Sequence, residues 1–477
     1  MAGEAKEKCA VVGALSANIE VDAAAITFLG LDALQHRGEE ASGIASISHA
    51  GQFEIQRGEG QVPFVHDEEA MSRLAGNLAI GHNRYSTSGS KEQNFGPMSD
   101  KAIHFALSLN GTLPSTLKLE RYLDGHNIRH ESTNDFGMMT YALAQEIRNG
   151  KEAPDAIEQT YPLFTGAFSC VAMHDDMIMA FRDPYGIRPL SLGKIADGHM
   201  VASETCGLDM ANAEYIGDVE PGELVIISKD GLQRRQLADN LGNKLDMFEF
   251  VYFSKLDSML YGQRVGSVRR RFGEQLASEY PLDGKNYLVV PVPDSSVPVA
   301  EGYADALGLQ HTTAIIKNRY RGGGRSFMQK NQELRQKYQK LKHTVIPEFV
   351  KDRDLIVIDD SIVRFNTMPV ICELLEAAGA RSITVLVSSP PVRFPDFYGI
   401  DTPYQHELVA ANLTISEIQK RLSKCRRLGY LSLSGMIKAT ELSEDVFNLS
   451  CFNGEYPIDI GYHKKEIYKP VSMEFAD

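Results

Sequence analysis

The chain has 477 residues, of which 43% are hydrophobic and 23% are charged, and its formal net charge at pH 7 is −14. This length exceeds what one ordinary hydrophobic core can organise and predicts two to four domains. The acidic balance argues against nucleic acid as a partner, because nothing in it would collectively neutralise phosphates. No stretch approaches about 18 consecutive apolar residues, and residues 1–8 lack the apolar core of a signal peptide, so we expect no membrane association.

The six cysteines are scattered singly along the chain, without a Cys-x-x-Cys pair. Disulfide frameworks and small metal sites both need cysteines at closer or paired spacings. The pattern therefore predicts a reducing compartment, and we expect a cytoplasmic protein.

Residues 9 to about 235 are predicted to form short strands separated by glycine-rich turns, with a few helices. Expected strands include 9–13, 52–56, 78–81 and 223–227. The polar, turn-rich segment 237–244 then indicates a crossing between domains.

From about residue 268 the pattern changes to strands that alternate with helices. Strands are expected at 287–291, 355–358 and 382–387, and helices at 370–378 and 416–422. This alternation predicts a parallel sheet with crossover helices. The basic, glycine-hinged segment 320–343 is typical of either a disordered linker or a lid over a substrate.

The most specific motif is the run 355–367, in which a short apolar strand ends at Asp359 and Asp360 and a turn leads into a helix. Ligands of open α/β sheets bind at the carboxyl ends of the strands. Backbone N–H groups of the turn and the helix N-terminus can hold a phosphate, and the acidic pair can bind ribose hydroxyls or Mg²⁺. The acidic pair alone would also fit a solvated strand end.

The whole run resembles the phosphoribosyl pyrophosphate (PRPP) loop of type I phosphoribosyltransferases, and its Asp-Asp-Ser-Ile-Val-Arg segment is similar to that of glutamine amidophosphoribosyltransferases. The segment 291–296 resembles the pyrophosphate loop of the same family. The PRPP-binding residues implied by the resemblance are Asp359, Asp360, Ser361, Arg364, Thr367 and Lys340. The implied Mg²⁺ ligands are Asp294, Asp359 and Asp360.

The first half carries five further landmarks, at 30–38, 41–45, 81–87, 109–112 and 134–135. Together they resemble the glutaminase domain of N-terminal-nucleophile amidotransferases. In that family the nucleophile is the first residue of the mature chain and its own α-amine is the general base, with the two groups titrating close to each other. Read alone, Cys9 would fit a buried core thiol; the resemblance makes it the nucleophile and implies that residues 1–8 are removed as a propeptide.

The same resemblance implies roles for the other residues of this site. Arg84 would clamp the α-carboxylate of glutamine, Asp135 would pair with its α-ammonium group, and Thr87 would also contact the substrate. The Asn110 side chain and the Gly111 N–H would form the oxyanion hole.

The resemblance extends over residues 9 to about 460 and implies the fold and domains. We expect an α+β sandwich of the N-terminal-nucleophile type (αββα) over 9–235, followed over 245–477 by an α/β type I phosphoribosyltransferase domain with a mainly parallel sheet and a C-terminal helical segment. The implied reaction is glutamine hydrolysis and ammonia transfer to C1 of PRPP, which begins purine synthesis. A homo-oligomer, either a dimer or a tetramer, is also implied.

Two departures from the family pattern bear on this expectation. Phe365 stands where the family has glycine, which predicts weaker or altered PRPP binding unless the backbone keeps an ordinary conformation and the ring points away. Some relatives hold a [4Fe–4S] cluster with four cysteines, where this chain has Asp246, Asp396, Asn448 and Cys451. One thiolate does not hold such a cluster, so we expect none.

Three interpretations follow from these residues. The first is the family reaction itself. The second, favoured by Phe365, is a specialised-pathway relative with another phosphosugar acceptor or with glutaminase activity only. The third is a non-enzymatic regulatory homologue, against which the retained Asp359, Asp360, Arg84 and Asn110 argue.

Overall fold

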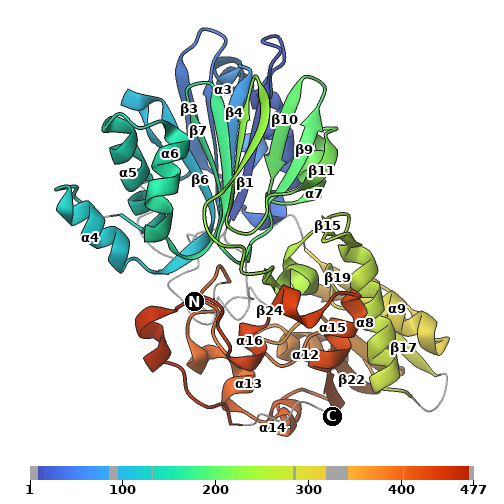
Figure 1. The fold of residues 1–477 in the computed structure, drawn as a ribbon. Helices are drawn as coiled ribbons and strands as arrows, with labels where there is room; N and C mark the ends of the chain where they lie inside the picture. The colour runs from blue at the N-terminus through green and yellow to red at the C-terminus, as the bar shows by residue number, and fades with distance from the viewer. Residues whose placement is uncertain are drawn as a thin grey trace.

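The computed structural model describes residues 9–84, 95–130, 133–282, 286–318, 342–400 and 402–471. The first half of the chain forms two sheets packed face to face, and the second half forms a separate parallel sheet wrapped by helices (Figure 1). Most of the segment 320–343, for which a linker or a lid was predicted, lies outside the described residues. Within the described part of the chain, no helix combines the length and apolar composition needed to cross a membrane.

Both sheets of the first half are antiparallel. The seven-stranded sheet has the order β11 (Glu214–Asp218), β9 (Ser191–Ile195), β10 (Gly198–Ala202), β1 (Cys9–Ser16), β4 (Leu78–Arg84), β2 (Ala41–Ile47) and β3 (Phe53–Glu59). The six-stranded sheet has the order β13 (Gly231–Gln236), β12 (Glu223–Ser228), β8 (Met177–Arg182), β7 (Thr165–His174), β6 (Phe105–Ser115) and β5 (Met98–Asp100).

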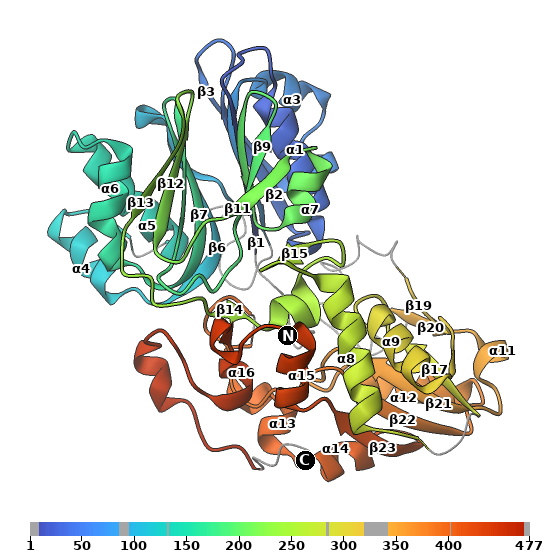
Figure 2. The ribbon, with the colours of Figure 1, turned by 45° about the vertical axis from the view of Figure 1, so that its right-hand side comes forward.

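Strand β1 is buried on both faces, because the second sheet covers one face of its sheet and helices cover the other. Its alternate side chains point to opposite sides: Val11 and Leu15 pack between the two sheets, while Ala10 and Val12 pack against α1 (Ala23–Ala33). Figure 2 shows α1 and α7 (Thr205–Met210) outside one sheet, with α4 (Leu117–Gly125), α5 (Asp135–Arg148) and α6 (Ala153–Thr160) outside the other. The predicted αββα sandwich is confirmed.

The sheet of the second half is parallel throughout. Its order is β18 (Gln310–His311), β17 (Tyr287–Pro291), β21 (Asp354–Asp359), β22 (Ser382–Val387) and β23 (Cys425–Tyr430). Along β21, Ile356 and Ile358 join the apolar cluster on one face, and Leu355 and Val357 join the cluster on the other. Burial on both faces explains why the strand appears in the sequence as a continuous apolar run.

Helices cover both faces of the parallel sheet. The cluster that includes Ile356 is closed by α8 (Val265–Glu279), α9 (Val297–Leu307) and α15 (Leu433–Thr440), and the opposite cluster by α12 (Met368–Ala377) and α14 (Ile415–Lys420). Pro369 occupies the first turn of α12, where its missing N–H costs nothing. The predicted α/β architecture is confirmed, whereas the domain limits 9–235 and 245–477 stay a prediction.

Short elements complete the fold. They are α2 (Val62–Val65), α3 (Glu68–Leu74), β15 (Met259–Leu260), β16 (Gln263–Arg264), β19 (Ile315–Lys317), β20 (His343–Val345), α11 (Pro347–Val350), α13 (Val409–Asn412) and α16 (Ser450–Asn453). Near the junction of the two halves, β14 (Leu245–Asp246) pairs with β24 (Phe447–Asn448), and the π-helix η5 (Glu249–Phe253) follows β14.

Candidate active site

Cys9 begins β1 and lies opposite Arg84, the last residue of β4, in the register of the two strands. Cys9 is half-buried, whereas Arg84 is 9% exposed. Gly38 packs against this strand end so closely that a Cβ atom there would lie 2.8 Å from the backbone nitrogen of Arg84. Strand pairing therefore brings the predicted nucleophile and the predicted carboxylate clamp together.

The predicted oxyanion residues lie in β6, on the other sheet of the sandwich. The side chain of Asn110 is 1% exposed, and its Nδ2 atom has no hydrogen-bond partner among the described residues. An amide donor buried in this way is costly unless a ligand accepts its hydrogen. Gly111 has φ +146, and a Cβ atom there would lie 2.0 Å from the Ala167 carbonyl oxygen, so the position requires glycine.

His82 joins the two sheets next to these residues. Its Nε2 atom lies 3.0 Å from the carbonyl oxygen of Leu109, which immediately precedes Asn110. Burial, opposed by that hydrogen bond and reinforced by the charge of Arg84, lowers the pKa of His82 to about 3. The ring is therefore neutral near pH 7, and Nε2 must carry the hydrogen because the carbonyl oxygen only accepts.

Asp135, predicted to bind the α-ammonium group, is the first residue of α5. One carboxylate oxygen accepts the Leu113 N–H at 2.9 Å, and the other accepts the Phe136 N–H at 2.9 Å. The N-cap residue Asn134 accepts the Gly137 N–H at 3.0 Å and fixes the start of the helix. These contacts hold the carboxylate beside Leu113 of β6, and the helix N-terminus favours its negative charge.

The second site forms where β17 and β21 end side by side. Pro291 pairs with Ile358 in this parallel ladder, so the loops that follow the two strands meet at one edge of the sheet. Asp359 and Asp360 are 7% and 8% exposed, and Asp359 accepts the Asp360 N–H at 3.0 Å. The structure thus places the acidic pair at the carboxyl edge of the sheet, where the sequence predicted it.

Hydroxyl groups engage both oxygens of the Asp360 carboxylate. Ser361 donates to one oxygen at 2.7 Å, and Ser295 of the opposite loop donates to the other. Asp294 is about half exposed and lies 3.7 Å from the Lys317 ammonium group. Among the described residues no three His, Cys, Asp or Glu side chains form a group that could hold a metal ion, so the three predicted Mg²⁺ ligands do not gather into such a group.

Other predicted PRPP ligands have partners within the protein. The Arg364 Nε atom donates to Glu407 at 2.8 Å, and this side chain is only 6% exposed. Thr367 is the N-cap residue of α12, where the backbone turns toward the helix N-terminus. Residues 1–8, Thr87 and Lys340 lie outside the described residues.

The backbone at Phe365 corrects one expectation. We expected phenylalanine here to require an ordinary L-residue conformation, but its φ is +58, in the left-handed region that a glycine would adopt freely. The ring packs against the apolar cluster that contains Ile362 and Met368. The loop therefore keeps a glycine-like backbone, and burial of the ring offsets the conformational cost.

The four positions matched to cluster ligands in some relatives are buried beside one another. Asp246 pairs with Asn448 between β14 and β24, and Asp246 forms an ion pair with Arg188 at 3.2 Å. Burial, together with the charge of Asp396, raises the pKa of Asp246 to about 8. Cys451 is the one thiol in this group and is also buried.

Several buried residues at the first site were given no role by the sequence analysis. They are Arg37, His82, Glu204 and Glu249. Each is buried and lies on a strand, turn or short helix near Cys9 or at the junction of the two halves. Neighbouring residues in the sequence do not indicate the partners of these side chains, because the contacts join residues up to 212 positions apart.

Comparisons with known proteins agree with this geometry. Residues 82–209 match the family described as glutamine amidotransferase domain, and residues 262–390 match the phosphoribosyl transferase domain. The chain is 38% identical to the amidophosphoribosyltransferase of Synechococcus elongatus over 95% of this chain and 92% of that protein. It is 34% identical to the Bacillus subtilis amidophosphoribosyltransferase, with 95% of each chain covered.

Solved structures show the same likeness across the whole fold. The glutamine PRPP amidotransferase of B. subtilis, complexed with ADP and GMP, superposes with a TM-score of 0.86 at 34% identity, covering 95% of this chain and 98% of that one. A structure described as the allosteric regulatory enzyme of purine biosynthesis gives a TM-score of 0.87, covering 96% and 99%. The chain therefore belongs to the amidophosphoribosyltransferase family, enzymes that combine a glutamine amidotransferase domain with a phosphoribosyltransferase domain.

Proposed function

We propose that this enzyme hydrolyses glutamine at Cys9 and transfers the ammonia to C1 of PRPP. The products are 5-phosphoribosylamine, glutamate and diphosphate, and the reaction begins purine synthesis. The observation that carries the proposal is the match to amidophosphoribosyltransferases over 95% of the chain. The comparisons do not favour an altered acceptor or a non-enzymatic role.

In the glutaminase half, the Cys9 thiolate attacks the side-chain amide carbon of glutamine. The Asn110 Nδ2–H and the Gly111 N–H stabilise the oxyanion that forms, and ammonia leaves as the tetrahedral intermediate collapses to a thioester. Water then releases glutamate. Arg84, Thr87 and Asp135 hold the α-carboxylate and α-ammonium groups, and the Cys9 α-amine acts as the base once residues 1–8 are removed.

In the transferase half, ammonia passes internally to the carboxyl edge of the parallel sheet and attacks C1 as diphosphate leaves. The Asp359 and Asp360 carboxylates accept hydrogen bonds from the ribose hydroxyls, in place of the serine hydroxyls that Asp360 now accepts. Ser361, Arg364, Thr367 and Lys340 belong to the same binding site, and the N-terminus of α12 attracts the phosphate.

Although the carboxylates at this edge do not gather into a metal-binding group by themselves, Mg²⁺ is commonly held by one or two carboxylates together with water and substrate phosphates. Asp294, Asp359 and Asp360 would hold it, and the bound ion would neutralise charge on the departing diphosphate. We further propose that the enzyme is cytoplasmic, forms a homo-oligomer and holds no iron–sulfur cluster, since one thiol among Asp246, Asp396, Asn448 and Cys451 is too few.

A Cys9→Ala variant tests this assignment. We expect it to lose glutamine-dependent synthesis while ammonia-dependent synthesis stays within about twofold of the wild type, because the two half-reactions use separate residues. The intact mass of the active wild type should show that residues 1–8 are absent. Glutamate release by a chain that retains residues 1–8, or by Cys9→Ala, would contradict the proposal.

A further inference from the structure

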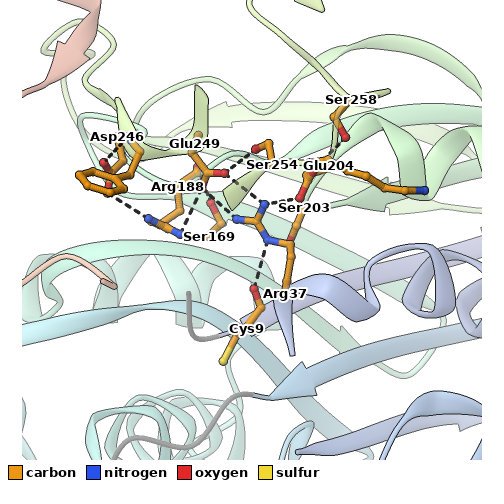
Figure 3. A network of polar contacts seen from close by, with 12 residues as sticks. Cys9, Arg37, Ser169, Arg188, Ser203, Glu204, Asp246, Glu249, Ser254 and Ser258 are labelled. Atoms are coloured by element: carbon orange, nitrogen blue, oxygen red, sulfur yellow. Dashed lines mark hydrogen bonds and ion pairs between the residues drawn. The ribbon is translucent and has the colours of Figure 1, made fainter. Parts of the chain in front are cut away.

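The junction between the two halves contains a fully buried group of charges that the proposed reaction does not use. It consists of Arg37, Arg188, Glu204 and Glu249, whose side chains are all 0% exposed (Figure 3). Arg37, Arg188 and Glu204 come from the sandwich, whereas Glu249 begins η5 after the crossing segment. We call this group the junction network.

Arg37 is the centre of the junction network. Its guanidinium donates to both Glu249 oxygens, at 2.9 and 3.2 Å, and also to Glu204. Although burial disfavours its charge, the two carboxylates raise the pKa of Arg37, so it stays a cation. A bidentate pair of this kind fixes the guanidinium plane as well as its position.

Arg37 also reaches the nucleophile. Its Nε–H points to the carbonyl oxygen of Cys9 at 3.4 Å, while the Cys9 sulfur points to the opposite side (Figure 3). The carbonyl belongs to the same residue as the thiol, so a shift of the guanidinium would tilt the Cys9 backbone and displace the sulfur. Cys9 is thus held by Arg37 on its backbone side.

The other end of the junction network is anchored in the second half. The Ser254 hydroxyl donates to Glu249 at 2.5 Å, and Arg269 of α8 donates to the carbonyl oxygens of Phe250 and Ser254, both at 2.8 Å. These contacts fix η5 at its two ends. Burial lowers the pKa of Arg269, and the charge of Asp360 in the transferase site opposes that shift.

Holding the two halves together does not require these charges. Desolvating two arginines and two glutamates is expensive, and well-packed apolar side chains often stabilise an interface as well or better. Contacts outside the junction network already join the halves: the Met259 N–H donates to the Thr205 hydroxyl at 2.9 Å, and Ile187 shares an apolar cluster with Phe397 and Tyr398. π-helical turns such as η5 are also found frequently at functional sites.

We propose that Arg37 is a positioning residue for the Cys9 nucleophile, and that Glu249 makes this position depend on where η5 of the second half lies. The inference rests on the proposed glutamine hydrolysis at Cys9. It assigns to the junction network a role in the rate of the glutaminase step and none in binding of glutamine, which Arg84 and Asp135 hold from elsewhere in the site.

Glu249→Gln is the main test, because glutamine keeps the size and one acceptor oxygen but removes the charge that orients Arg37. We expect kcat for glutamine-dependent synthesis to fall at least about tenfold, since small misplacements of reacting groups have effects of this size or larger. KM for glutamine should change less than about threefold, and ammonia-dependent synthesis less than about twofold.

Asp246→Asn is the matched control. Asp246 is a similarly buried carboxylate and the other acidic partner of Arg188, and its connection to Arg37 runs through Arg188 and Glu249. We expect its glutamine-dependent kcat to stay within about twofold of the wild type. An equal fall in both variants would show that the junction network is only structural and would overturn the inference.

Ser254→Ala gives a second route if Glu249→Gln does not fold. It removes one hydroxyl that holds Glu249 and should lower the glutamine-dependent kcat in the same direction by a smaller factor. Unchanged kcat in every folded variant, with a Cys9-dependent wild type, would refute the positioning role alone. Glutaminase activity that survives Cys9→Ala would instead refute the proposed function.

Discussion

The ring of His82, on one sheet of the sandwich, bonds the carbonyl oxygen of Leu109 on the other sheet at 3.0 Å. This contact ties the strand that carries Arg84 to the strand that carries Asn110. The Nε2–H donates this bond, which by itself favours the protonated ring, but burial outweighs it and keeps the ring neutral near pH 7.

The low pKa of His82 makes the stability of the fold depend on pH. The pKa of His82 is about 3 in the folded chain and about 6.5 in the unfolded chain. As the pH falls below 6.5, the unfolded chain therefore binds a proton at this residue and the folded chain does not. This contribution to stability is complete above pH 6.5. Between about pH 6 and 4 it should decline by about 1.4 kcal/mol per pH unit.

Chemical unfolding of the wild type and of His82→Gln over this pH range measures the effect. Glutamine can still donate to Leu109 but does not titrate, so the difference between the two free energies of unfolding should shrink as the pH falls. The comparison also cancels the contribution of Asp246, which is present in both proteins. Its raised pKa has the opposite effect, lowering the stability of the fold as the pH rises from about 4 to 8. A difference that does not vary with pH would contradict the prediction.

Asn110→Ala should lower the glutaminase kcat by about 10²- to 10³-fold, because it removes one donor of the oxyanion hole. KM for glutamine and ammonia-dependent synthesis should change little. Ser108→Ala is the control, since Ser108 is buried two residues earlier on the same face of β6 and its hydroxyl also has no hydrogen-bond partner among the described residues. Comparable losses in the two variants would point to a packing effect.

Asp360→Asn should reduce ammonia-dependent synthesis at least about 10²-fold while Cys9-dependent glutamine hydrolysis remains measurable. The carboxylate accepts hydroxyl donors at both oxygens, and an amide accepts at only one. Asp354→Asn, at the opposite end of β21, provides the control and should leave synthesis within about twofold. Loss of both half-reactions in a folded Asp360→Asn protein would show that the acidic pair is structural.

Phe365→Gly tests the PRPP loop. The sequence alone predicted tighter PRPP binding in this variant, but the backbone already has φ +58 and the ring packs into the apolar cluster. We now expect the Kd for PRPP, measured by calorimetry, to change less than about threefold. Relief of about 1–2 kcal/mol of conformational cost should roughly balance the lost packing of the ring.

Phe365→Val is the informative contrast. A β-branched residue is strongly disfavoured at positive φ, so this variant should unfold more easily and bind PRPP more weakly than Phe365→Gly. Tenfold or tighter PRPP binding by Phe365→Gly would show that the ring, despite its packing, hinders the phosphate.

Much of the architecture was predictable because buried strands appear in the sequence as runs of apolar residues. The run 355–358 is apolar throughout since β21 is covered on both faces, and residues 287–291 and 382–387 form β17 and β22 with the predicted limits. The acidic pair was found because it directly follows the apolar run 355–358, whereas Cys9, Arg84 and Asn110 were found because their motifs resemble those of a known family. Their roles in catalysis stay predictions.

Contacts between distant residues were not predictable. Nothing near Arg37 in the sequence indicates Glu249, and nothing near His82 indicates Leu109, because tertiary packing alone creates these pairs. The positive φ of Phe365 was missed for another reason: residue preferences assign such a conformation to glycine, and packing of the ring against the apolar cluster outweighs that preference.

The junction network also affects how the two halves would behave apart. Cutting the chain within 237–244 would leave Arg37 and Arg188 on one fragment and Glu249 on the other, each charge losing a buried partner. In each fragment the former interface would be exposed to solvent, with apolar surface next to charged side chains that have lost their partners. Separately produced halves should therefore aggregate or rearrange, and evolutionary exchange of either half for a foreign one would require replacing both sides of the junction together.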